Sequence, residues 1–343
     1  MRKFSLIIFL FLFVLISQVF AQGYDYLVRK AENLLRDQKY EEALQVYEQA
    51  WQSGEYHYFD YYNAACASAL LDKPDDAFGY LGKAVNAGLI DSKIMRTDED
   101  FNSLHADSRW MNILDSMDNK LKAIEESFPD AHPEDVVIDL PAPVLKGEIS
   151  VEEAMQNRRS IRNYQEVPLT LQEIAQILWA GYGLSRKIEN SPAFLRGGLR
   201  TAPSAGALYP LDLYVAAWNV TDLPAGIYYY KSETHQLVRI KEGNTRQELS
   251  DAAFNQPHFK TAAAAIVYSA IFERNTRKYG ERGRERYVCM DLGHSGQNIY
   301  LQAYALKIGT CAIGAFTDLA VKMVVGMTKP EEPLYIMPLG KVE

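Results

Sequence analysis

Small and apolar residues recur with a period of 34 in the first third of the chain. Three pairs of alanines are each separated by 34 residues: Ala31 and Ala65, Ala43 and Ala77, and Ala50 and Ala84. The apolar stripes at helical spacing around them comprise Leu34, Leu35, Leu44, Tyr47, Leu70, Leu71, Phe78 and Leu81. Because small residues let two antiparallel helices approach closely, the pattern predicts paired helices in an internal repeat.

The pattern changes in the second half, where short apolar runs alternate with helical segments. The predicted strands cover residues 213–218, 226–230, 236–240, 263–271 and 333–339. Capping boxes at Ser150 and Thr170, each with a glutamate three residues later, predict helix starts. A long helix is expected over residues 285–306, so this half is predicted to be an α+β domain.

Prolines separate the two halves. Pro129, Pro133, Pro141 and Pro143 prevent a continuous helix, because proline lacks an amide hydrogen and restrains the residue before it. We therefore expect a helical domain over residues 22–127, a linker over 128–147 and the α+β domain over 148–343.

The first residues have the features of a signal peptide. Arg2 and Lys3 precede an apolar stretch over residues 6–16, and Ala21 ends a small-residue exit before Gln22. We expect residues 1–21 to direct export to the bacterial periplasm or the medium. An uncleaved membrane anchor over residues 4–21 is the alternative, since that stretch just reaches spanning length.

Charge and cysteine content exclude several classes of protein. Residues 22–135 contain 23 acidic and 11 basic residues, whereas residues 136–343 contain 21 and 23. Nucleic-acid binding requires a basic surface, so no nucleic-acid partner is expected. Cys66, Cys289 and Cys311 are too few and too scattered for a disulfide framework or a cysteine metal site, and the six histidines lack metal-binding spacing.

The 34-residue pattern resembles tetratricopeptide repeats over about residues 24–91, with a looser third segment over residues 100–114. The resemblance implies a groove that binds a peptide or protein partner, and a spacer is the alternative. An aromatic cluster belongs either to that groove or to the core of the domain; it comprises Tyr56, Tyr58, Phe59, Tyr61 and Tyr62.

An arginine cluster follows the first predicted helix of the second half. Arg158, Arg159, Ser160 and Arg162 stand within five positions. Guanidinium groups pair bidentately with phosphate and the hydroxyl adds a donor, so the cluster suits an oxyanion. A solvated basic helix end is the alternative.

Further blocks follow in order: PSAGALYP at 203–210, GHSGQN at 293–298, KIGTCAIGA at 307–315 and LGK at 339–341. Together with the arginine cluster, they resemble the nitroreductase family of flavoproteins, most closely its SagB-type (thiazole/oxazole oxidase-like) branch, over about residues 136–343. The resemblance implies an α+β homodimer, with a mixed sheet flanked by helices and one FMN at each subunit interface.

The resemblance also implies roles for individual residues. Arg158, Ser160 and Lys341 correspond to ligands of the FMN phosphate and ribityl chain, with Arg159 adjoining them. Arg162 corresponds to a cation near N1 and the C2 carbonyl, where positive charge stabilises the reduced flavin.

Two other segments are expected along the isoalloxazine ring. The loop against its face, contributed across the dimer interface, comprises Pro203, Ser204, Ala205 and Gly206. The segment whose backbone amide faces N5 comprises Ile313, Gly314 and Ala315. Many relatives have Glu-Gly in place of Gly314-Ala315, which weakens the last correspondence.

Azoline-oxidising members of the family carry a Lys-Tyr pair before the GH-x-x-QN helix, and Lys278 and Tyr279 are similarly placed. Such a pair can take a proton while the flavin takes a hydride. A solvated loop is the alternative, because residues 274–286 contain six basic residues.

The resemblance therefore implies an FMN-dependent oxidoreductase that acts on a small molecule or peptide, with NAD(P)H as a candidate electron donor. The alternative is a catalytically silent, exported binding protein whose helical repeats hold partner peptides.

Overall fold

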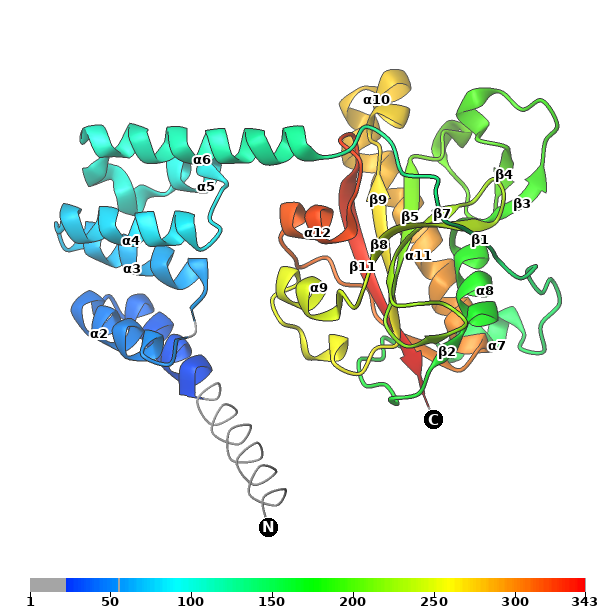
Figure 1. Cartoon of the computed structure of the whole chain (residues 1–343), viewed down its shortest axis with the longest axis horizontal. Helices are drawn as coiled ribbons and strands as arrows, with labels where there is room; N and C mark the ends of the chain where they lie inside the picture. Colours follow the sequence, from blue (N-terminus) through cyan, green and yellow to red (C-terminus); the bar gives the residue numbers. More distant parts are fainter. Residues whose placement is uncertain (1–22, 55, 343) are drawn as a thin grey trace, which may run out of the picture. The chain divides into compact units, whose positions relative to one another are not determined.

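The computed structural model describes residues 23–54 and 56–342, which form two compact units that divide between Ser127 and Phe128 (Figure 1). The predicted signal peptide, residues 1–21, lies outside the described residues. Within the described part of the chain, no helix combines the length and apolar character that a membrane crossing requires.

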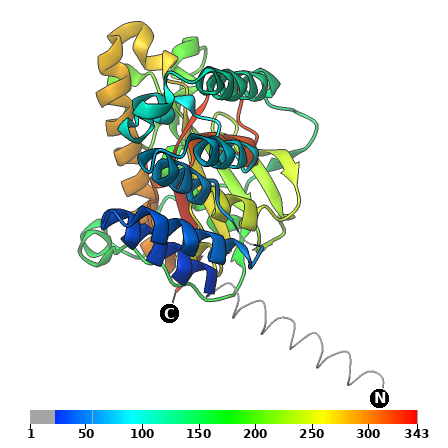
Figure 2. The same cartoon turned by 90° about the vertical axis from the view of Figure 1, so that its left-hand side faces the viewer.

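The first unit is a stack of helices that lie side by side in both views (Figures 1 and 2). A helix over residues 23–36 precedes α2 (Tyr40–Trp51), α3 (Tyr58–Leu70), α4 (Pro74–Asn86), α5 (Ser92–Thr97), the 3₁₀ helix η1 (Glu99–Leu104) and α6 (Ser108–Ser127). All six alanines of the 34-residue pattern are fully buried, as close approach between helices requires. The helical character of this unit is confirmed, and its assignment to the tetratricopeptide type stays a prediction.

The looser third segment completes the core of the first unit. Its buried side chains that pack with α3 and α4 are Phe101, Leu104, Trp110 and Leu114. The aromatic cluster is divided between the core and the surface. Tyr62 is buried, whereas Tyr56 is 59% exposed and lies against Tyr61, with ring centroids 5.6 Å apart.

The second unit is built around a seven-stranded antiparallel sheet with the strand order β1-β8-β7-β5-β9-β11-β10. The strands are β1 (Val137–Asp139), β5 (Leu211–Ala217), β7 (Gly226–Lys231), β8 (Gln236–Glu242), β9 (Ala264–Ala270), β10 (Ile308–Thr310) and β11 (Glu332–Lys341). β5 and β9 are buried along their whole length. Their register places Tyr214 opposite Val267, which also pairs with Ile336 of β11.

Helices cover both faces of this sheet, which the apolar side chains on its two sides require (Figure 1). α8 (Leu171–Tyr182) and α11 (Val288–Ala305) pack on one face, and α9 (Arg246–Ala252) and α12 (Asp318–Val325) pack on the other. The smaller elements are α7 (Val151–Asn157), β2 (Leu169–Thr170), β3 (Leu184–Lys187), η2 (Ala193–Leu195), β4 (Gly198–Arg200), η3 (Ala205–Ala207), β6 (Val220–Thr221), η4 (Pro257–Phe259), α10 (Glu273–Tyr279) and the π-helix η5 (Gly283–Tyr287).

The α+β class and the five strands predicted from the sequence are confirmed, and the long helix is present as η5 followed by α11. Parallel pairing occurs between β2 and β6, in a separate two-stranded sheet. The resemblance implies a mixed sheet. In this chain the antiparallel pairs form the main sheet, and the parallel pair forms a second, two-stranded sheet.

Residues 128–147, which the prolines predict to be a linker, pack on the second unit. They contribute β1, whose Val137 pairs with Val238 of β8, and Leu140 joins the core. The Gln176 side chain accepts the N–H of Val144 at 2.7 Å and donates to its carbonyl at 3.1 Å. Prolines prevent a helix here, but they permit an extended chain with few amide hydrogen bonds.

A buried carboxylate fastens this segment to the sheet. Glu331, only 1% exposed, accepts hydrogen bonds from Tyr214 at 2.8 Å, Ser269 at 2.6 Å and Thr328 Oγ1 at 2.6 Å. Nε2 of His132 lies 3.3 Å from the same carboxylate. Burial opposes ionisation, but the hydrogen bonds outweigh it and lower the pKa of Glu331 to about 2.

We predict that this carboxylate makes the second unit sensitive to acid. Because the folded pKa lies below the ordinary value of 4.5, its stabilisation is present above about pH 4.5 and is lost as the pH falls towards 2. The loss should amount to about 3 kcal/mol. Urea unfolding of wild type and Glu331→Gln between pH 6 and pH 3 measures about 2 kcal/mol of this loss, because the rest occurs below pH 3. The variant should be less stable at pH 6 with a flatter pH profile, and identical profiles would contradict the prediction.

Candidate functional site

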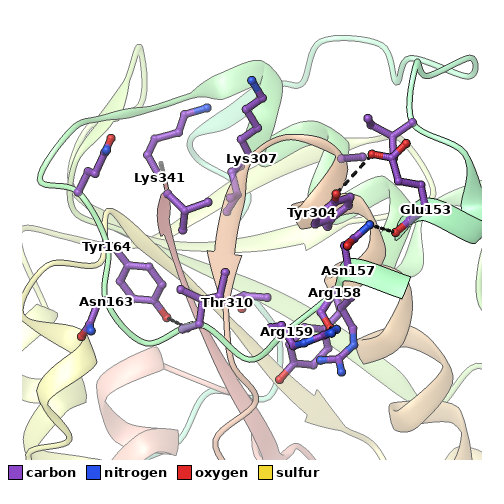
Figure 3. Close-up of a pocket in the computed structure, with 17 residues that line it drawn as sticks. Glu153, Asn157, Arg158, Arg159, Asn163, Tyr164, Tyr304, Lys307, Thr310 and Lys341 are labelled. Carbon is purple, nitrogen blue, oxygen red and sulfur yellow. Dashed lines mark hydrogen bonds between the residues drawn. The ribbon is translucent and has the colours of Figure 1, made fainter. Parts of the chain in front are cut away.

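A cavity of about 750 Å³ lies at the β10 edge of the sheet (Figure 3). α7 and the segment after it, the end of α11, and strands β10 and β11 form its wall. The lining residues that matter for its chemistry are Arg158, Arg159, Tyr300, Lys307, Thr310 and Lys341. Its volume falls within the range of about 300–1,000 Å³ that is typical of small-molecule and cofactor sites.

The local sequence explains how the arginines reach this cavity. Ser150 caps α7 by accepting the N–H of Glu153 at 3.1 Å, and the helix ends at Asn157. Arg158 and Arg159 follow immediately. The N–H of Ile161 then donates to the Thr310 carbonyl at 2.9 Å, which ties the segment to β10.

Tyr300 of α11 organises the arginine segment. Its hydroxyl lies 3.1 Å from Ser160 Oγ and accepts the N–H of Ala312 at 2.7 Å. The Arg158 guanidinium stands over its ring, 5.1 Å from the centroid. Sequence reasoning missed this residue, although it lies two positions after the GHSGQN block, because a tyrosine inside a helical pattern resembles an ordinary packing residue.

Lys341 also lines the cavity, where its ammonium group pairs with the Glu173 carboxylate. The same carboxylate accepts the N–H of Thr170 at 2.9 Å, which completes the predicted capping box of α8. Figure 3 shows Lys341 and Lys307 projecting together on one side of the cavity, while Arg158 and Arg159 gather on another. Cations therefore approach the cavity from two directions.

The wall of the cavity includes a residue whose buried hydrogen-bonding group is unsatisfied. Among the described residues, Thr310 Oγ1 is a buried hydroxyl without a hydrogen-bond partner, and Thr310 lies in the wall of the cavity. Such a group is costly unless something pairs with it. Arginine, lysine and hydroxyl donors together fit a phosphorylated ligand.

Ser160, Arg162 and the segment 313–315 lie outside the lining of this cavity. Ile313 is buried and its N–H donates to the Ile336 carbonyl at 2.9 Å, so that amide is already engaged. Gly314 and Ala315 are exposed, and the Ala315 carbonyl accepts Gln256 Nε2 at 3.1 Å. Burial lowers the pKa of His258, and the neighbouring Arg162 guanidinium lowers it further.

A second cluster contains the loop 203–206 and the candidate catalytic pair. Ser204 Oγ donates to Asp291 at 2.5 Å, and the Ala205 N–H donates to the same carboxylate at 3.2 Å. At Gly206, where φ is +67°, a Cβ would stand 2.6 Å from Tyr279 Oη and 3.1 Å from Lys278 Nζ. The structure thus brings the predicted loop and the predicted pair into contact.

The two clusters lie at different levels of α11. Asp291 marks one and Tyr300 the other, about 13 Å apart along the axis at 1.5 Å per residue. Within one chain, the arginine segment and the loop 203–206 are therefore not side by side.

The fold and the cavity define an α+β domain with cationic side chains whose chemistry suits an anionic ligand. The sequence pattern of the nitroreductase family matches residues 155–341, and the chain belongs to that family. A Methanocaldococcus jannaschii protein named as a nitroreductase is 40% identical over 194 residues, which is 57% of this chain and 92% of that protein. The second unit is accordingly a nitroreductase-family oxidoreductase domain.

More distant relatives share the same domain. McbC of Escherichia coli, named as a microcin B17-processing protein, is 29% identical over 42% of this chain and 54% of its own length. A solved nitroreductase-type structure from Anabaena variabilis has a TM-score of 0.52 and 31% identity. It covers 61% of this chain, which spans only 42% of the Anabaena chain.

We predict that Gly206→Ala displaces the Lys278–Tyr279 pair. The left-handed backbone should cost about 1 kcal/mol with alanine, and the new methyl group would push the tips of both side chains away. Gly243→Ala is the matched control, because Gly243 also has a positive φ of +97° but no atom within 4 Å of a Cβ. Denaturant unfolding should show similar losses in both variants, and NMR of ¹³C-labelled tyrosine should show a shifted Tyr279 only in Gly206→Ala. An unshifted ring would contradict the contact.

Proposed function

We propose that this protein is an exported, homodimeric, FMN-dependent oxidoreductase of the SagB-like type. The observation that carries the proposal is the cation-lined cavity, organised by Tyr300, in a nitroreductase-family domain. Retention of Arg158, Ser160, Arg162 and Lys341 argues against the alternative of a catalytically silent scaffold, since such a scaffold has no need of them.

The residues around the cavity fit the phosphate and ribityl chain of FMN. Arg158 and Ser160 would hold the phosphate, and Thr310, whose buried hydroxyl has no partner among the described residues, would join them by turning that hydroxyl towards the cavity. Lys341 would join them by exchanging its Glu173 partner for the phosphate.

FMN, when bound, supplies hydride transfer through N5 of its ring. Arg162 would place positive charge near the N1 side of the ring, and the backbone of Gly314 and Ala315 would face N5. Lys278 and Tyr279 would take or hold the substrate proton. Because the loop 203–206 lies along α11 away from the arginines of its own chain, we propose that the loop of a second copy completes the site.

Substrate and electron donor follow from weaker signals. A small-molecule or peptide substrate is proposed, in line with the naming of McbC as a microcin B17-processing protein. In such a reaction the substrate itself would donate the electrons. NAD(P)H is the alternative electron donor, although nicotinamides are scarce outside the cytoplasm. The helical unit is proposed to hold a partner peptide, for which Tyr56 and Tyr61 offer exposed and half-exposed aromatic surface.

We predict that the purified protein is yellow with one FMN per chain, and that Arg158→Ala weakens FMN binding by about 1.5–3 kcal/mol, the value of a charged hydrogen bond. Arg162→Ala should weaken it similarly. Flavin fluorescence quenching measures the affinity, with Arg36→Ala of the first unit as the exposed control. A colourless protein that also fails to take up added FMN would overturn the proposal.

Glu173→Gln is a companion variant that should change the affinity for FMN in the opposite direction. Glutamine preserves the capping box of α8 but no longer neutralises Lys341. FMN should bind more tightly to this variant, whereas riboflavin, which has no phosphate, should bind unchanged. Equal affinities of wild type and variant for FMN would remove Lys341 from the phosphate site.

We predict that Lys278→Ala or Tyr279→Phe slows substrate oxidation by roughly a hundredfold, the usual contribution of a general base, with unchanged FMN content. Stopped-flow reduction of bound flavin by azoline peptides, NADH and NADPH gives the measurement. Reduction by a nicotinamide requires no protein base, so it should be insensitive to both changes. If wild type and both variants react at equal rates with every donor, the pair is part of a solvated loop and has no catalytic role.

A further inference from the structure

Asp291 is a buried carboxylate that the proposed chemistry does not use. It lies on α11, is 1% exposed, and faces the loop that follows β4. Oδ2 accepts the Ser204 hydroxyl at 2.5 Å and Oδ1 accepts the Ala205 N–H at 3.2 Å. Ser204 Oγ in turn accepts the N–H of Tyr209 at 3.0 Å. One carboxylate thus closes the whole turn from residue 204 to residue 209.

This turn has an unfavourable backbone. Gly206, Ala207 and Tyr209 have φ values of +67°, +56° and +47°, and the last two are not glycines. Left-handed backbone at non-glycine residues persists only where surrounding contacts impose it, and such strain concentrates at functional sites. Asp291, acting directly and through Ser204, supplies contacts at both ends of the turn.

The strained turn stands against the candidate catalytic pair. The open Cα face of Gly206 is the surface that Tyr279 Oη and Lys278 Nζ approach. α10, which carries the pair, is anchored beside the same turn by Arg274, which donates to Pro210 O at 3.3 Å and pairs with Asp212 at 2.8 Å. The turn and α10 therefore share one frame, and the position of the turn decides where the two side-chain tips can lie.

We propose that Asp291 is a positioning residue, which holds the turn 204–209 in its strained form and thereby sets the place of Lys278 and Tyr279. The inference rests on the proposed function for its effect on turnover, but its effect on the turn is independent of any cofactor. Asp291 acts on the pair indirectly, through Ser204, Ala205 and Gly206.

Hydrogen exchange tests the first part on the full-length protein without added ligand. Asp291→Asn and Ser204→Ala should accelerate exchange of the Ala205 and Tyr209 amides by tenfold or more, while the amides in the middle of α11 keep their protection. Ser204→Thr keeps the hydroxyl and should restore slow exchange. Glu331→Gln, a buried carboxylate variant away from the turn, is the control for general destabilisation. Unchanged exchange at Ala205 and Tyr209 would overturn the inference.

Turnover tests the second part. Asp291→Asn and Ser204→Ala should lower kcat, measured at saturating FMN, by roughly tenfold to a hundredfold, the scale of a misplacement of about 1 Å. The decisive comparison combines Asp291→Asn with Lys278→Ala and Tyr279→Phe: if Asp291 acts through the pair, its loss adds nothing further once both members are absent.

The outcomes separate the two hypotheses. Additive losses of kcat at saturating FMN would overturn the positioning role and leave the proposed function standing. A wild-type protein that binds no FMN would defeat the proposed function, while hydrogen exchange would still decide whether Asp291 holds the turn. If Asp291→Asn fails to fold, the half-buried Ser204→Ala variant carries the same test.

Discussion

The Ser295 hydroxyl holds α11 to two neighbours, and both halves of the candidate site depend on that helix. Ser295 Oγ donates to the Gly181 carbonyl of α8 at 2.7 Å and lies 2.7 Å from Tyr268 Oη in the sheet. Gly181 permits this approach, because a Cβ there would stand only 3.0 Å from Ile299. A shift of α11 would move Asp291 and Tyr300 together, so packing in the core fixes the register of the loop 203–206 and of the arginine segment.

Buried carboxylates tie the surface segments to this frame, and the number of donors around each decides its electrostatics. Glu331 receives several hydrogen bonds, which lower its pKa despite burial. Asp291 receives only Ser204 and Ala205, and burial dominates, so its pKa is raised. Asp212 receives two guanidinium groups, one of them from the helix that carries Lys278. The least satisfied of the three carboxylates, Asp291, holds the loop that the candidate catalytic pair contacts.

The sequence predicts those features of the fold that depend on the spacing of apolar residues and on the order of motifs along the chain. Alternation identified five strands, and the repeat of 34 identified alanines that prove fully buried. The structure of residues 128–147 was harder to predict, since prolines exclude a helix but do not distinguish a free linker from an extended strand. The pairing of Lys341 with Glu173 and the roles of Tyr300 and Asp291 depend on side-chain directions that only tertiary packing sets.

The pairing of Lys341 with Glu173 affects which anions the cavity can bind. The cavity lining contains four cationic side chains and one carboxylate, Glu153, and Glu173 holds one of the four cations in a neutral pair, which limits the attraction of small anions. A ligand must then bring enough negative charge, at the right place, to exchange for that carboxylate. Under the proposed function, a terminal phosphate meets this condition better than a monovalent anion does, because its double charge would pair with both Arg158 and Lys341. The capping role of Glu173 in α8 would keep the competing carboxylate in place during that exchange.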